Sequence, residues 1–330
     1  MHAPMHWRTA ATALVSLWLC AAPPGQEPAR PRLGVFFWHD SPNDLTALTG
    51  IRAGLARAGV DAIWIERHAD SDHERATAML AELRTAGCEL VFALGTQATL
   101  LAKDALREVP VVFAAVSDAV ASNVVPDWSG SGGNLCGASN WIGAPAVLDT
   151  FRLAVPGLRR LGVVRSRTSG IVSGAETATM RAHLAAEPDL GVTLVESVAH
   201  DGDDVERAVA SLVARRVDAI WVPIDLTVYS DFDAVRRGVG GSRLPLLTTA
   251  AAGVGNGAHV GCVGDYELHG RRTAAIALRV LAGADPGRLP VDRMHGTQVK
   301  VDLTAARRDG IELPLSVLAV ADELLVEAPR

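Results

Sequence analysis

Polar and aromatic side chains follow the short apolar runs of this chain in two series, where predicted strands end. The first series contains Trp38, His39, Thr96, Gln97, Ser117 and Asp118, and the second contains Arg165, Arg167 and Asp225. Such groups can hold a small polar molecule, and parallel α/β sheets bind ligands outside the carboxyl ends of their strands. The two series therefore predict a binding site between two similar domains.

Several of these positions have a second, purely structural interpretation. Thr96 follows Gly95 where a strand gives way to a helix, so it can cap the helix or lie beside N–H groups that meet an anion. Asp118, Asp225 and Asp265 can likewise be caps or turn residues. The aromatic residues that could stack on a ligand, or belong to the core or its rim, are Trp38, Trp141 and Tyr266.

The motifs of common catalytic sites are missing from the chain. There is no Gly-x-Ser-x-Gly elbow, no phosphate-binding Gly-x-x-x-x-Gly-Lys and no His-Glu-x-x-His pair of a zinc-protease helix. The run 253–258 (GVGNGA) fits the dinucleotide fingerprint but leads into another strand-like run, so we expect a loop there. We expect no metal and no cofactor.

The elements that must position these residues occur twice in the same order. Apolar runs begin at Leu33 and Leu161, and each is followed by a helical stretch, a second run, a helix, a third run and a final strand entered through proline. Alternating runs and helical patterns predict βαβ units on parallel sheets. We therefore expect an α/β protein of two sister lobes, each a Rossmann-like, doubly wound parallel sheet.

The tail departs from the repeat and is long enough to cross to the first lobe and return. It contains a helix at 267–282, a short extended piece, a strand from Thr297 and a helix from Thr304. We expect a three-strand hinge whose first crossing lies near 137–141. The expected boundaries are a leader and linker at 1–30, lobe one at 31–138 plus about 265–292, and lobe two at 139–264 plus about 293–330.

Composition narrows the class of protein. The chain has 330 residues, of which 49% are apolar, and a net charge of −6 without a basic stripe, so nucleic acid is not an expected partner. The uncharged run Thr9–Leu19 after Arg8 fits a signal-peptide core, and Cys20 is a possible lipidation site. The cysteines that remain after cleavage should be small buried residues: Cys88, Cys136 and Cys262.

The chain resembles the ABC-transporter substrate-binding proteins of the tryptophan/tyrosine-binding type over 32–327. The segments that carry the resemblance are ALGTQATLLAKDA (93–105), GGNLCGAS (132–139), DAIWVPIDL (218–226) and GDYELHGRRTAAIALRVLAGADPGRLPV (264–291). The resemblance implies a type I periplasmic-binding-protein fold and ligand capture without catalysis. It also places Thr96, Ser117, Asp118, Ser139, Asp225, Asp265 and Tyr266 at the cleft.

Three departures from the family pattern concern the ligand. Arg165-Ser166-Arg167 stands where amino-acid binders tend to have Asn, Ala119 stands in place of Pro, and Leu226 stands in place of Asn. One hypothesis is that Arg165 or Arg167 binds a carboxylate or similar anion; the alternative is that both project into solvent.

The expected function is capture of an amino-acid-like or aromatic metabolite by an exported, periplasmic or extracytoplasmic protein, a monomer that delivers it to an ABC permease. One alternative is a ligand-sensing subunit that reports to a membrane kinase or similar receptor. The other is an α/β enzyme, for which Asp40, Asp118, Asp225 and His39 are candidates without a signature that pairs them.

Overall fold

A computed structural model describes residues 30–168, 170–293 and 296–326. The predicted leader, with Thr9–Leu19 and the possible lipidation site at Cys20, lies outside these ranges. In the part of the chain that is described, no helix combines the length and the apolar character needed to cross a membrane.

The first sheet is entirely parallel and has the strand order β11-β5-β4-β3-β1-β2. Side chains alternate along β1, so Val35 and Phe37 lie on one face and Phe36 on the other. The strands are β1 (Arg32–Phe37), β2 (Ile63–His68), β3 (Leu90–Leu94), β4 (Val111–Val116), β5 (Leu135–Ser139) and β11 (Asp292–Arg293).

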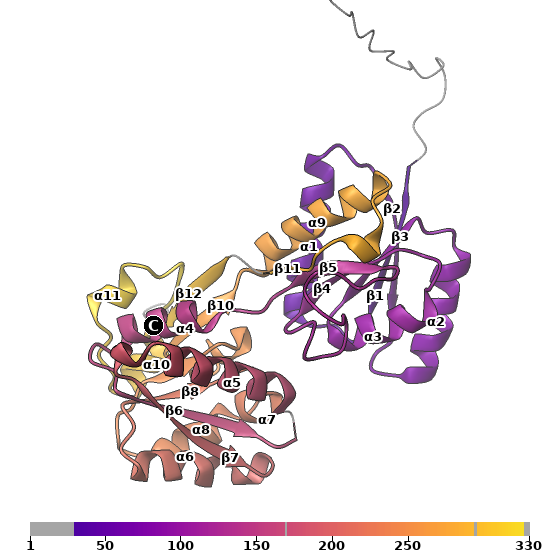
Figure 1. The fold of residues 1–330 in the computed structure, drawn as a ribbon. Helices are drawn as coiled ribbons and strands as arrows, with labels where there is room; N and C mark the ends of the chain where they lie inside the picture. The colour runs from indigo at the N-terminus through magenta and orange to yellow at the C-terminus, as the bar shows by residue number, and fades with distance from the viewer. Residues whose placement is uncertain (1–29, 169, 294–295, 327–330) are drawn as a thin grey trace, which may run out of the picture. The chain divides into compact units, whose positions relative to one another are not determined.

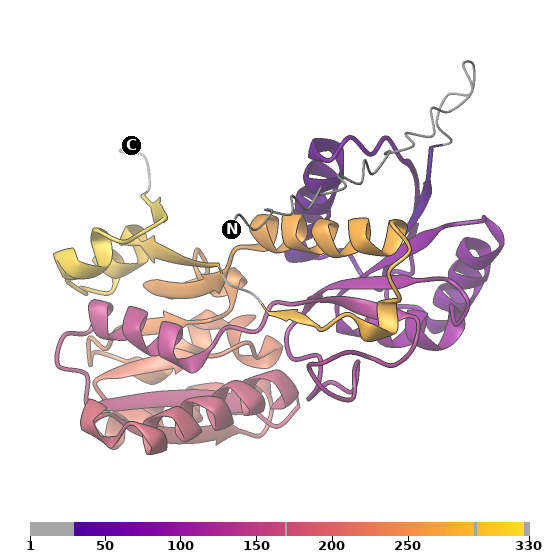
Figure 2. The same ribbon diagram turned by 45° about the horizontal axis from the view of Figure 1, so that its top comes forward.

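Helices cover both faces of this sheet (Figure 1). The first face packs against α1 (Pro42–Arg57) and α9 (Tyr266–Leu281), which lie side by side (Figure 2). The second face packs against α2 (His73–Thr85) and α3 (Thr96–Ala105). Apolar residues at helical spacing account for this packing, as with Ala76, Leu80 and Leu83 of α2.

The second sheet has the order β13-β12-β10-β9-β8-β6-β7, in which only β10 and β12 pair antiparallel. Its strands are β6 (Arg160–Ser166), β7 (Thr193–Ala199), β8 (Ala219–Val222), β9 (Leu246–Thr248), β10 (Val260–Gly264), β12 (Thr297–Asp302) and β13 (Glu323–Leu325).

Helices also cover both faces of the second sheet. One face packs against α4 (Ala144–Ala154), α5 (Gly170–Ala186) and α11 (Leu315–Leu318), and the other against α6 (Val205–Ala214), α7 (Leu226–Tyr229) and α8 (Phe232–Val239). The helix α10 (Leu303–Arg308) follows β12.

The predicted fold class, two α/β lobes built on mostly parallel sheets, is confirmed. The first sheet contains β1 to β5 and β11, and the second contains the other strands. The chain therefore passes between the two sheets three times, after β5, after β10 and after β11. The run 253–258 is a turn after a short 3-10 helix at Ala251–Gly253, as expected of a loop. All three cysteines of the described chain, Cys88, Cys136 and Cys262, are buried free thiols.

Two glycines allow α1 and α9 to approach closely. A Cβ on Gly50 would lie 2.1 Å from the carbonyl oxygen of Glu267, and one on Gly270 would lie 2.0 Å from that of Ala47. No side chain fits at either position while the two backbones stay where they are. This contact fixes the amino end of α9, which carries Tyr266, against the helix that carries Asp44.

Candidate functional site

The amino terminus of α3 lies at the carboxyl end of β3 and has no side-chain cap. Its N-cap is Gly95, with φ of 88°, and Thr96 and Gln97 are the first two helical residues. The expectation that the Thr96 hydroxyl could cap this helix is therefore wrong, because Thr96 lies one position too late. The N–H groups of the first turn are left for another acceptor, the arrangement that binds anions at helix termini.

Asp44 of α1 lies beside this helix terminus. It is 6% exposed, and its carboxyl is the group nearest to Gly95, about 3.5 Å from the position of a Cβ there. Burial raises the pKa of Asp44 to about 6, although a hydrogen bond with Ser41 and the charge of His39 oppose the shift. Sequence reasoning missed Asp44 because an acid in the first turn of a helix is ordinary.

The ends of β4 and β5 are joined by hydroxyl contacts. Ser139 Oγ donates to the carbonyl oxygen of Ser117 at 2.6 Å and accepts from the Trp141 N–H at 3.2 Å. Before this point β4 has an irregular register at Ala115, whose φ is +57° and whose N–H donates to His269 Nε2 at 3.0 Å. Burial lowers the pKa of His269 to about 4, so the imidazole is neutral and can accept this bond.

Asn140 carries an unpartnered acceptor. The residue is 5% exposed, its N–H donates to Val116, and its Nδ2 donates to the Tyr266 hydroxyl at 2.7 Å. Its Oδ1 is buried and has no hydrogen-bond partner among the described residues. Since nearly all buried polar atoms are paired, this oxygen is suited to accept an N–H or O–H from a bound molecule. Sequence reasoning missed Asn140, which directly follows Ser139 at the end of the same strand.

Four of the predicted residues in the first lobe have other partners or lie in solvent. Asp118 Oδ1 accepts from the N–H groups of Val120 and Ala121, and Asp265 caps α9 through the Leu268 N–H. The Trp38 ring packs on His73 with centroids 4.7 Å apart, and His39 is exposed. At the strand ends of this lobe, hydrogen bonds join Ser139 to Ser117 and to the backbone of Trp141, and Asn140 to Tyr266. Thr96 and Gln97 begin α3 at the end of the neighbouring strand β3. Asp118 closes a turn, and Asp265 caps α9.

In the second lobe, Asp225 joins the end of β6 to α5. It is 0% exposed and accepts from Ser166 N at 2.7 Å, from Ser166 Oγ at 2.8 Å and from Ser173 Oγ at 2.8 Å. Both carboxylate oxygens are thus engaged by the protein. Asp225 shapes the loop between β6 and α5, and its α7 N-cap position carries no side-chain cap bond.

The two candidate arginines lie differently. Arg165 pairs with Glu196 on the neighbouring strand β7, and the same carboxylate pairs with Arg181 of α5 at 2.6 Å. Arg167 is exposed and has no ion pair among the described residues. An anion-binding role for Arg165 would require it to leave Glu196, whereas Arg167 forms no ion pair with a residue that the structure describes.

Glu176 is a buried acid in the middle of α5. Its Oε2 accepts from the Ile224 N–H at 2.7 Å, and it lines a small cavity with Trp141 and Trp221. Burial raises the pKa of Glu176 to about 7, against the effect of the Ile224 hydrogen bond. In the sequence Glu176 has the appearance of a solvent-facing helical residue, so no local signal identified it.

The raised pKa of Glu176 predicts a pH-dependent stability. Because the pKa of Glu176 in the folded state exceeds its unfolded value of 4.5, the folded state keeps this proton to a higher pH than the unfolded state does. The free energy of unfolding therefore declines as the pH rises from 4.5 through about 7. Glu176→Gln should remove the decline, which amounts to about 1.4 kcal/mol per pH unit over that range. Urea unfolding at pH 5 and pH 8 checks this prediction, with the exposed Glu187→Gln as the control. If the difference in unfolding free energy between Glu176→Gln and wild type were the same at both pH values, the prediction would be contradicted.

Comparison with known proteins identifies the family. A model described as ABC transporter substrate binding protein matches residues 33–325. The chain belongs to this family.

Two solved structures and one curated relative illustrate the similarity. The protein from Streptococcus pneumonia, solved in complex with L-Trp, is 26% identical with a TM-score of 0.72, covering 90% of this chain and 100% of that one. A ligand-free, open substrate-binding protein with adhesive properties from Clostridium difficile, 22% identical, has a TM-score of 0.78 over 90% and 100% of the two chains. A tyrosine-binding protein of Clostridioides difficile is 26% identical over 214 residues, 65% of this chain and 61% of that protein.

Membership in the ABC transporter substrate-binding family excludes one of the functional classes left open by the sequence. The family consists of binding proteins, so the alternative of an α/β enzyme is set aside. The strand-end side chains are accordingly candidates for holding a ligand unchanged.

Proposed function

We propose that this chain captures an amino-acid-like or aromatic metabolite between its two lobes for an ABC importer. The observation that carries the proposal is the buried, unpartnered Oδ1 of Asn140, in a protein 26% identical to one solved with L-Trp. An ammonium group supplies the donor that this oxygen lacks. The tyrosine-binding relative supports the same ligand class, although the chain spans only 61% of that relative's length.

The remaining groups of the site complement the rest of an amino acid. The uncapped N–H groups at Thr96 and Gln97 suit an α-carboxylate, which the positive end of α3 also favours. The Tyr266 ring, whose hydroxyl is fixed by Asn140, and the Trp141 ring can contact an apolar or aromatic side chain. Asp225 acts indirectly by holding the loop after β6, and Arg167 remains available for a second anionic group.

We further propose that the protein is extracytoplasmic and works as a monomer with a membrane permease. The predicted signal sequence before residue 31 supports export, and lipidation at Cys20 would anchor the protein. Closure of the lobes about the three connections would let the permease distinguish loaded from empty protein.

A thermal-shift screen of residues 31–330 tests this function, with amino acids, aromatic acids, purines, sugars and peptides as probes. A ligand at 100 times its dissociation constant should stabilise the folded state by about 2.7 kcal/mol. We expect the largest shift from an aromatic L-amino acid, recovered unchanged, and a much smaller shift for Asn140→Leu. A ligand that is chemically converted, or a response to sugars alone, would contradict the proposal.

A further inference from the structure

A pocket of about 390 Å³ lies in the second lobe, away from the strand ends described above. Its lining includes Leu246, the first residue of β9, and His259, which immediately precedes β10. These residues lie at the amino ends of their strands, whereas Ser166 and Asp225 lie at or beyond carboxyl ends. A molecule in this pocket would therefore occupy a different place from a ligand at the strand ends.

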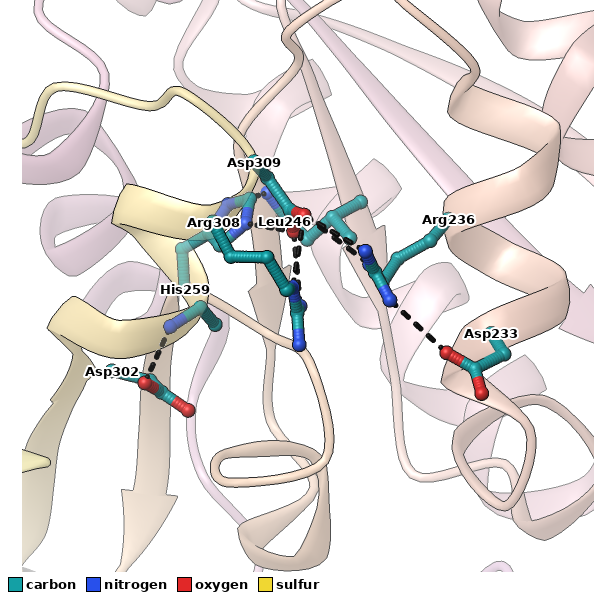
Figure 3. A network of polar contacts seen from close by, with 8 residues as sticks. Asp233, Arg236, Leu246, His259, Asp302, Arg308 and Asp309 are labelled. Carbon is teal, nitrogen blue, oxygen red and sulfur yellow. Dashed lines mark hydrogen bonds and ion pairs between the residues drawn. The ribbon is translucent and has the colours of Figure 1, made fainter. Parts of the chain in front are cut away.

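The single carboxylate of the lining, Asp309, is already engaged (Figure 3). It accepts from Arg308 Nε and Nη2 at 3.0 and 3.1 Å, from Arg236 Nη2 at 3.1 Å and from His259 Nε2 at 3.0 Å. Burial alone would raise the pKa of Asp309, but its hydrogen bonds with Arg308 and His259 hold it at about 2. Asp309 is therefore a fixed anion with no capacity to neutralise a further cation.

One guanidinium of the lining has no acidic partner. Arg243 lines the pocket near Gly310 and forms no ion pair with any residue that the structure describes. Arg308 also keeps Nη1 outside its bidentate pair with Asp309. His259 is neutral, since its Nδ1 accepts from the Leu246 N–H at 2.9 Å. The lining holds three arginines and one aspartate, and Arg236 also pairs with Asp233 outside the lining at 3.1 Å. The positive charge of the lining that has no acidic partner among the described residues is therefore that of Arg243.

Three apolar residues of the pocket wall are nearly buried. Val239, Leu246 and Ile311 are each at most 9% exposed and lie in the lining. Two features oppose an anion here, the carboxyl end of α8 and the carboxylate of Asp309. The Gly240 N–H already bonds the last-turn carbonyls of Arg236 and Arg237, and Asp309 is paired with Arg236 and Arg308. Positive charge next to an apolar wall suits an anion joined to a compact apolar group.

We propose that this pocket binds a small organic oxyanion, a carboxylate or a phosphate monoester with a compact apolar group. Arg243 and the free side of the Arg308 guanidinium hold the anionic oxygens, and Val239, Leu246 and Ile311 contact the apolar part. The proposal is independent of the ligand proposed for the strand ends.

Isothermal titration of residues 31–330 tests the pocket with phenylacetate, phenyl phosphate, inorganic phosphate and the neutral control phenylacetamide. We expect phenylacetate or phenyl phosphate to bind, and Arg243→Gln to weaken that binding about tenfold. Gln keeps much of the length and polarity of the side chain, so the fold should persist, which an unchanged urea midpoint verifies. Arg152→Gln, an exposed site on α4 of the same lobe, is the matched control.

The variants also separate this pocket from the strand-end site. Binding that persists in Asn140→Leu and Arg152→Gln but weakens in Arg243→Gln supports the pocket, and the stronger of the two organic probes identifies the head group. Equal binding to Arg243→Gln, equal binding of phenylacetamide, or no binding of any probe at millimolar concentration overturns the proposal.

Discussion

Gly270→Ala is expected to lower the free energy of unfolding by about 2–3 kcal/mol. The added Cβ would lie 2.0 Å from the carbonyl oxygen of Ala47, a backbone atom that cannot rotate away, so α1 and α9 must separate. The gain in helix propensity, about 1 kcal/mol for Gly to Ala, is smaller than this cost. Separation would also move Tyr266 away from Asn140, so ligand affinity should fall together with stability.

Gly174→Ala is the matched control for this prediction. Gly174 is also inside a helix, α5, but a Cβ there meets nothing within 4 Å. The same chemical change should therefore be neutral or stabilise by up to about 1 kcal/mol. Urea unfolding of both variants measures the difference, and equal stabilities would show that the α1–α9 contact is not the tight one described.

Asp225→Ala should cost about 3 kcal/mol of unfolding free energy, because it leaves the buried hydroxyls of Ser166 and Ser173 without their acceptor. The Ser166 N–H loses its acceptor as well, so the loop between β6 and α5 should open more often. We expect faster hydrogen exchange at the Ser166 amide and weaker ligand binding.

Asp231→Ala is the control for Asp225. It removes one N-cap bond to the Ala234 N–H at the start of α8, in the same lobe, and should cost about 1 kcal/mol. A cost for Asp225→Ala no larger than that of Asp231→Ala, with unchanged exchange at Ser166, would refute the role given to Asp225.

Local sequence signals predicted most of the fold. The apolar runs that begin with a proline contain the strands β4 and β9. The helix predicted at 267–282 is α9, and its bounds agree within one residue at each end. The strand predicted from Thr297 is β12. These elements carry their own periodicity and turn residues, so tertiary contacts were not needed to recognise them.

The candidate site was predicted less completely, because its decisive interactions join residues far apart in sequence. The pair of Arg165 with Glu196 spans 31 residues, and the bond of Asn140 to Tyr266 spans 126. Glu176 lies on a helix whose pattern does not distinguish a buried acid from an exposed one. The N-cap of α3 is Gly95 and not the adjacent Thr96, because the backbone of Gly95, with φ of 88°, is not helical.

Ligand capture at Asn140 is tested most simply by isothermal titration of residues 31–330 with L-tryptophan and L-tyrosine, in wild type and in Asn140→Leu. We expect one binding site per chain, an unchanged ligand, and affinity at least about tenfold weaker in the variant, since a hydrogen bond from a charged donor contributes about 1.5–3 kcal/mol. Equal affinity in Asn140→Leu, or no heat from either amino acid, would contradict capture of an amino acid at this site.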